Sequence, residues 1–147
     1  MVAKQLHTSL IPNWETPEEI LYPLVKEFGP FELDAAADAQ NAKAPKFFSL
    51  EDSAFQHRWT GLVWLNPPYG KGIGDWIQKA YLSSIEDGAT VVCLVPARTD
   101  TAWWRDWVMG KAEVRFLRGR VRFKTPKGLR MSAAPFPSAL LVYRGHG

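Results

Sequence analysis

The sequence predicts an α/β domain with a mostly parallel sheet flanked by helices, and three observations favour this class. The length of 147 residues suits one domain with its own core. Helix-like and strand-like segments alternate along the chain. Residues 62–65 and 90–95 are continuous apolar runs, typical of strands covered on both faces. Because no repeat, low-complexity tract or linker interrupts this pattern, residues 1–147 are predicted to form a single domain.

The first helix is predicted to begin near Thr16. Thr16 can cap its N-terminus, Pro17 suits the first helical position, and Glu19 completes a capping box. An apolar face follows at helical spacing and stops at Gly29-Pro30. Pro23 lies within this pattern and is predicted to kink the helix or split it into two pieces.

The remaining elements follow from apolar periodicity and from the turn residues between the segments. Residues 38–55 have no clear period and are predicted to be loop, apart from one short strand. The helices are predicted at 73–85 and 100–109. The strands are predicted at 31–34, 46–49, 62–65, 90–95, 113–117, 121–123 and 138–144.

Composition excludes several classes of protein. Hydrophobic residues make up 46% of the chain and charged residues 22%, which is ordinary for a globular protein and excludes a disordered chain. The single cysteine, Cys93, excludes an intrachain disulfide and a Cys-rich zinc site. No apolar run approaches the roughly 20 residues of a membrane helix, and Met1 to Leu10 lack the apolar stretch of a signal peptide. We therefore expect a soluble cytoplasmic protein.

Charge is distributed unevenly between the two halves. Residues 1–70 contain 5 Lys/Arg and 9 Asp/Glu, whereas residues 71–147 contain 13 Lys/Arg and 6 Asp/Glu. The basic half suggests a polyanionic partner. A solvated surface without a partner explains the charge alone equally well.

The most informative motif is Asn66-Pro67-Pro68-Tyr69, directly after the apolar run 62–65. Two prolines end the strand and stiffen the loop. In open α/β sheets, ligands bind beyond the carboxyl ends of the strands. The motif is therefore placed where an active site is expected, with a plain strand-ending turn as the alternative.

This motif suits chemistry on an amino group attached to a flat ring. Such an amine is a poor nucleophile because its lone pair is delocalised into the ring. The Asn66 side-chain oxygen and the Pro67 carbonyl can accept its two hydrogens, direct the lone pair and stabilise the developing positive charge. Pro68 stiffens the loop, and the Tyr69 ring can stack on a flipped base.

On these residues the chain resembles the phage and prophage DNA N6-adenine methyltransferases, the Dam-like family. The resemblance runs from about Trp14 to Tyr143. It rests on four segments in order, which are Trp14-Glu15-Thr16-Pro17, Phe31-Glu32-Leu33-Asp34-Ala35-Ala36, Trp64-Leu65-Asn66-Pro67-Pro68-Tyr69-Gly70 and Val95-Pro96-Ala97-Arg98-Thr99-Asp100-Thr101.

The resemblance implies a Rossmann-like fold and S-adenosylmethionine as the methyl donor, without a metal. The residues that it assigns to the donor are Trp14, Thr16, Pro17, Asp34, Ala35, Ala36 and Asp52. The sequence departs from the broader methyltransferase pattern because alanines stand where a Gly-x-Gly turn is usual.

Each of the donor assignments has a structural alternative. Thr16 can be a helix cap, which is compatible with a donor role. Asp34 can cap the turn after its strand, Asp52 can be a solvated loop carboxylate, and Trp14 can pack as a hydrophobic staple.

The resemblance also implies double-stranded DNA as the partner, in a bacterial or phage-infected cell. Arg118, Arg120 and Arg122 alternate, so in a strand they would share one face. Arg98 follows the strand at 90–95, at the same sheet edge as Asn66, and Lys71 follows the motif. These five residues are the DNA-binding candidates, with ordinary solvated side chains as the alternative.

The predicted function is methyl transfer from S-adenosylmethionine to N6 of adenine in DNA, without a separate target-recognition domain. Other planar amines remain open, namely cytosine N4, guanine N2 in RNA and a protein glutamine amide. A DNA-binding relative that has lost catalysis is a further alternative. The sequence indicates neither the target site nor the oligomeric state.

Overall fold

The computed structural model describes residues 15–49, 53–124 and 133–145. The helical elements are α2 (Glu18–Phe28), the 3-10 turn η2 (Ala54–Gln56), α3 (Ile73–Glu86) and α4 (Ala102–Trp107). The strands are β1 (Leu33–Asp34), β2 (Lys46–Phe47), β3 (Leu62–Leu65), β4 (Thr90–Pro96), β5 (Glu113–Phe116) and β6 (Ser138–Tyr143).

These strands form one mixed sheet in the order β2-β1-β3-β4-β6-β5. Neighbours from β2 to β4 are parallel, whereas β6 runs antiparallel to both β4 and β5. The α/β class is confirmed, but the mostly parallel sheet is confirmed only in part. The reason is connectivity, because no described helix separates β5 from β6, and strands joined without a crossover helix pair antiparallel.

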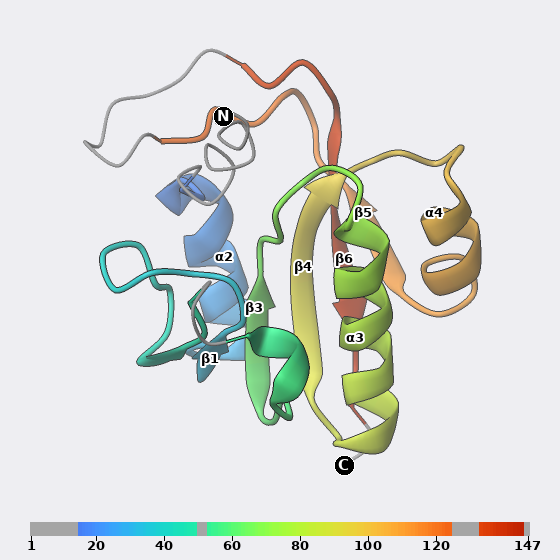
Figure 1. Ribbon diagram of the computed structural model, residues 1–147. Helices are drawn as coiled ribbons and strands as arrows, with labels where there is room; N and C mark the ends of the chain where they lie inside the picture. Colours follow the sequence, from blue (N-terminus) through green and yellow to red (C-terminus); the bar gives the residue numbers. More distant parts are fainter. Residues whose placement is uncertain (1–14, 50–52, 125–132, 146–147) are drawn as a thin grey trace, which may run out of the picture.

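Helices cover both faces of the sheet (Figure 1). Strand β3 shows how one segment serves both faces. Leu62 and Trp64 pack in a cluster that contains Leu24 of α2, whereas Val63 and Leu65 pack in a second cluster that contains Ile77 of α3. All four residues of β3 are buried, as the continuous apolar run predicts.

Helix α2 differs from the prediction at its start. The N-cap position is occupied by Pro17, and no side chain caps the helix, so the predicted Thr16 cap and capping box are wrong. Because the helix begins at Glu18, Thr16 lies one residue too early to cap it. Pro23 is exposed and lies within one continuous helix, so the predicted split is wrong and the predicted kink stays a prediction.

Residues 121–123 and helix α4 also differ from the sequence prediction, and β1 and β2 are each two residues shorter than predicted. Residues 121–123 are not a strand, and their neighbour Lys124 forms only an isolated antiparallel bridge with Glu15. Helix α4 is shorter than predicted, since Thr101 caps it by accepting a hydrogen bond from the backbone N–H of Trp104.

The parallel strands direct their carboxyl ends to one edge of the sheet, where the arrowheads of β3 and β4 lie in Figure 1. Asp34 at the end of β1 is in register with Trp64 of β3. The segments that follow β1, β3 and β4 therefore begin close together. This edge carries the site described next. In the parts of the chain that the structure describes, no helix has the length and apolar character that crossing a membrane requires.

Candidate active site

The Asn66 carboxamide lies directly after β3 and is held at both ends. Its Nδ2 atom donates a hydrogen bond to Thr16 Oγ1 at 3.3 Å. Its Oδ1 atom accepts from the Tyr69 hydroxyl at 2.8 Å, and the same hydroxyl lies 3.2 Å from the Leu94 carbonyl oxygen of β4. The Asn66 amide is therefore fixed by two segments that are distant in sequence and by its own loop. We call the group of Thr16, Asp34, Asn66 and Tyr69 at this edge the corner.

Tyr69 is turned towards other aromatic side chains. Its ring meets Phe136 edge-on at a centroid distance of 5.7 Å and Phe123 at 6.3 Å. Burial raises the pKa of the Tyr69 hydroxyl well above its usual value, so the group stays protonated and acts as a donor. Tyr69 thus has a fixed place beside Asn66.

Phe136 contacts the candidate site, and the sequence analysis missed it. Beyond its edge contact with Tyr69, it lies under the Arg98 guanidinium, whose central carbon is 5.7 Å from the ring centroid. The backbone N–H of Ala97 donates to the Pro137 carbonyl, which ties this segment to the end of β4. No periodic pattern marks Phe136, so no sequence signal was available to find it.

Thr16 is buried, with 2% of its surface exposed, in a segment that is anchored beside Asn66. Neighbouring Glu15 exchanges two backbone hydrogen bonds with Lys124, at 3.0 and 2.9 Å. The Glu15 carboxylate also pairs with Lys43 at 2.8 Å. Thr16 is therefore held in place independently of its bond to Asn66.

Asp34 ends β1 and is 3% exposed. Its two carboxylate oxygens accept backbone hydrogen bonds from Ala36 at 3.2 Å and from Lys43 at 2.9 Å. Burial removes water from the charged form and raises the pKa of Asp34 to about 7. Asp34 thus holds the loop after β1, which is the structural role that the sequence left open.

Ala35 and Ala36 follow Asp34 at the same edge. Ala35 is fully buried, and its backbone N–H donates to the Trp64 carbonyl of β3 at 3.0 Å. Trp14 and Asp52, the other two donor candidates, lie outside the described residues.

Arg118, Arg120 and Arg122 line one pocket of about 210 Å³, although their segment is not a strand. Pro17, which precedes α2, and Ile20 within it also line this pocket. All three arginines are exposed, whereas Val121 and Phe123 between and after them are buried. Exposed and buried residues therefore alternate only from Arg120 to Phe123, and the strand predicted at 121–123 is absent.

Lys71 and Arg98 are also exposed, each just beyond the carboxyl end of a central strand. Lys71 follows the Asn66 loop, and Arg98 follows β4. Among the described residues, no group of three or more His, Cys, Asp and Glu side chains is arranged to hold a metal ion.

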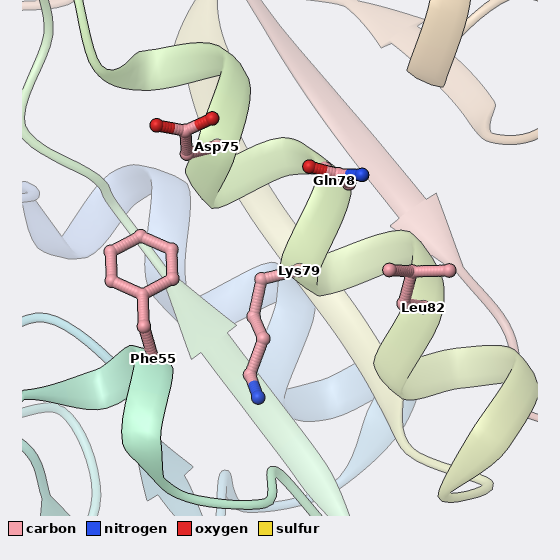
Figure 2. Close-up of a pocket in the computed structure, with 5 residues that line it drawn as sticks. All are labelled: Phe55, Asp75, Gln78, Lys79 and Leu82. Carbon is pink, nitrogen blue, oxygen red and sulfur yellow. The ribbon is translucent and has the colours of Figure 1, made fainter.

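A second pocket, of about 350 Å³, lies on the outer side of α3. Figure 2 shows Phe55 of η2 across from the side chains of α3. It is lined by Phe55, Asp75, Gln78, Lys79 and Leu82. None of the residues predicted to act lines this pocket.

An α/β sheet with a stiff amide-bearing loop at the end of a central parallel strand is the arrangement expected of the amino-group methyltransferases. The model of the family described as DNA N-6-adenine-methyltransferase (Dam) matches residues 4–146. The chain belongs to this family, which confirms the predicted resemblance to the Dam-like proteins of phages.

Two curated relatives resemble parts of the chain. The DNA N-6-adenine-methyltransferase of Escherichia phage T1 is 36% identical over 104 residues, which cover 69% of this chain and 42% of that protein. YfdM of Escherichia coli (strain K12), which carries a provisional methyltransferase name, is 38% identical over 64 residues. That match covers 39% of this chain and 70% of YfdM. The chain thus spans less than half of the phage T1 protein.

Proposed function

We propose that this chain transfers a methyl group from S-adenosylmethionine to the exocyclic N6 amine of adenine in double-stranded DNA. The observation that carries the proposal is the Asn66 carboxamide, held between Thr16 and Tyr69 at the carboxyl edge of the sheet. Membership of the family of DNA N-6-adenine-methyltransferases supports the choice of reaction and substrate.

In this proposal Asn66 and Pro67 hold the target amine. Asn66 Oδ1 and the Pro67 carbonyl oxygen accept one amine hydrogen each, and Pro68 limits the movement of both acceptors. The two oxygens stabilise the positive charge that develops as the nitrogen attacks, and they need no reorganisation because the loop is already stiff. No residue here has to act as a strong base.

Tyr69 is proposed to stack against the adenine after the base leaves the helix. Adenine N6 is out of reach within the base stack, so a flipped base is required. The neighbouring rings of Phe123 and Phe136 and the hydrogen bond to Asn66 hold the Tyr69 ring in one place. A fixed ring beside the two acceptors can align a flat base with them.

Of the residues assigned to the donor, Asp34 supports such a site by its position and chemistry. It ends the strand next to β3, so it stands at the same carboxyl edge as Asn66. A carboxylate has about four acceptor sites, and the N–H groups of Ala36 and Lys43 use two of those on Asp34. When bound, S-adenosylmethionine supplies an electrophilic methyl carbon. The parallel strands and this edge also support a Rossmann-like methyltransferase fold.

The DNA backbone is proposed to bind the exposed cations around this edge. Arg118, Arg120 and Arg122 share one pocket wall, and Lys71 and Arg98 lie beyond β3 and β4. Arginine and lysine side chains neutralise phosphates and release counterions, which gives binding without sequence preference.

The test is incubation of the purified chain with plasmid DNA and isotopically labelled S-adenosylmethionine, followed by nucleoside analysis by mass. We expect label in N6-methyladenine. Label in N4-methylcytosine, or transfer to RNA or protein in parallel reactions, would replace adenine as the substrate. DNA binding without donor binding in calorimetry would indicate a relative that has lost catalysis.

A further inference from the structure

We propose that Thr16 is a positioning residue whose hydroxyl orients the Asn66 carboxamide, so that Oδ1 rather than Nδ2 faces the target amine. The inference rests on the proposed function, because it explains how the acceptor at Asn66 is presented. It gives Thr16 a role through Asn66, in place of a helix cap or a direct contact with the donor.

Asn66 needs such a partner because the two ends of a carboxamide are nearly equal in shape and opposite in hydrogen bonding. With Oδ1 forward, the side chain accepts a hydrogen from the target amine. With Nδ2 forward, two donor groups would face each other, and the amine could not be held. A stiff backbone fixes the position of the side chain but leaves the rotation of its amide open.

The Thr16 hydroxyl lies where it can fix the rotation of the Asn66 amide. Its Oγ1 accepts from Asn66 Nδ2 at 3.3 Å. Because Thr16 is only 2% exposed, water has little access to replace this acceptor. The bonds of Glu15 to Lys124 and Lys43 hold the segment from the other side. The acceptor is therefore present before any substrate arrives.

Tyr69 supports the same orientation from the opposite end of the amide. Its hydroxyl donates towards Asn66 Oδ1 at 2.8 Å and lies 3.2 Å from the Leu94 carbonyl oxygen, a second acceptor for the same proton. A carbonyl oxygen has two lone pairs, so the bond from Tyr69 does not by itself prevent Oδ1 from accepting from a target amine. Thr16 accepts from the amide nitrogen and Tyr69 donates to the amide oxygen, so both contacts favour the same orientation of the amide.

The first test detects the contact between Thr16 and Asn66 by NMR and needs no methylation reaction. In 15N-labelled protein, the Asn66 side-chain NH2 signals are assigned by their absence in Asn66→Ala. We expect Thr16→Val, which has the same shape but no acceptor, to move these signals towards the values of a free amide. We expect Thr16→Ser to keep them. Unchanged Asn66 signals in Thr16→Val would overturn the inference.

The second test measures how substitution of Thr16 changes turnover. Thr16→Val is expected to lower kcat by roughly 100-fold, the loss typical of a displaced reacting geometry, with the KM for the donor unchanged. Thr16→Ser is expected to restore most of kcat. In an Asn66→Ala background, Thr16→Val is expected to cause no further loss, because the two residues act as one unit. Thermal melting of each variant checks that it is folded.

Two kinetic outcomes would overturn the inference. A raised donor KM with unchanged kcat would mean that Thr16 contacts the donor itself. Additive losses from Thr16→Val and Asn66→Ala would mean that Thr16 acts independently of the amide. A wild-type chain that methylates no DNA would instead overturn the proposed function, and the NMR comparison would still decide whether Thr16 holds the amide.

Discussion

The corner around Asn66 and the arginine segment 118–122 lie at neighbouring places in the molecule but are built differently. At the corner, Thr16 and Asp34 are almost fully buried, and Asn66 and Tyr69 have hydrogen bonds to defined atoms. In the arginine segment the three charged side chains are exposed, and the backbone belongs to no helix or strand.

The difference follows from what each region has to do in the proposed function. Holding an unreactive amine requires dipoles that are already fixed, and burial with full hydrogen bonding fixes them. Holding a phosphate backbone requires charge and reach, which exposed arginines supply without a rigid scaffold. Changes at the corner should therefore affect turnover, and changes in the arginine segment should affect DNA affinity and its dependence on salt.

The largest effect is expected for Asn66→Ala. It removes one of the two acceptors for the amine and should lower turnover by about 100- to 1,000-fold, the range found when a preorganised polar group is removed. Donor affinity should be unchanged. Single-turnover methylation and calorimetry with S-adenosylmethionine measure the two quantities.

The matched control is Gln78→Ala, which removes a side-chain amide of α3 from the pocket that none of the predicted site residues lines (Figure 2). Its turnover should equal that of the wild type. Full activity in Asn66→Ala would show that the Asn66 amide does not hold the target amine. The proposed difference in function between the corner and the arginine segment would then be wrong.

The next effect is a pH dependence at Asp34. Its pKa is raised to about 7 by burial, so the folded state binds this proton more tightly than the unfolded state does. The stabilisation is fully present below the unfolded pKa of about 4, and it is lost as pH rises through 7. The free energy of unfolding of the protein should therefore fall between pH 4 and 7, with a slope that approaches about 1.4 kcal/mol per pH unit.

Urea unfolding of the wild type and of Asp34→Asn across this range measures the slope. The Asp34→Asn variant cannot ionise at this position. The stability of the variant relative to the wild type should therefore increase as pH rises. A carboxyl carbon signal of Asp34 that titrates near 4 in NMR would contradict the prediction.

A smaller effect is expected for Arg120→Ala in the arginine segment. Loss of one phosphate contact should weaken DNA binding at all sequences and reduce the slope of log affinity against log salt by about 1. Fluorescence anisotropy at several salt concentrations measures this. Turnover at saturating DNA should be unchanged, in contrast to Asn66→Ala.

Arg105→Ala is the control for this prediction. Arg105 is an exposed arginine of α4 and pairs with Asp106 at 3.1 Å. Its loss should leave the salt slope of DNA binding as in the wild type. Equal slopes for Arg120→Ala and the wild type would place Arg120 among the ordinary solvated side chains.

The smallest effect is expected for Arg115→Met, at the start of the basic region. Arg115 contacts the two carboxylate oxygens of Glu27 at 2.6 and 2.7 Å and Glu113 at 2.6 Å. These pairs are partly exposed and screened by water, so each contributes little to stability. Melting should show a slight loss at low salt that fades at high salt. A large loss that persists in salt would show that this surface is as rigid as the corner.

The sequence by itself determined the elements whose signal is local. The continuous apolar runs of β3 and β4 and the helical spacing of α3 predicted these elements nearly to their ends, and the final strand β6 was also found. The two prolines after β3 placed Asn66 at the carboxyl edge of a central strand. These predictions succeeded because burial on both faces and proline stiffness act through neighbouring residues.

Only the tertiary structure decided how distant segments meet. Thr16 looked like a helix cap, yet it lies 50 residues from its partner Asn66 and contacts it across the edge of the sheet. Phe123 and Phe136, which both lie between β5 and β6 in the sequence, contact Tyr69 at the end of β3. The antiparallel pairing of β6 with β4 and β5 makes the sheet mixed. Such contacts depend on strand order and register, which are set by the packing of the whole core rather than by any local pattern.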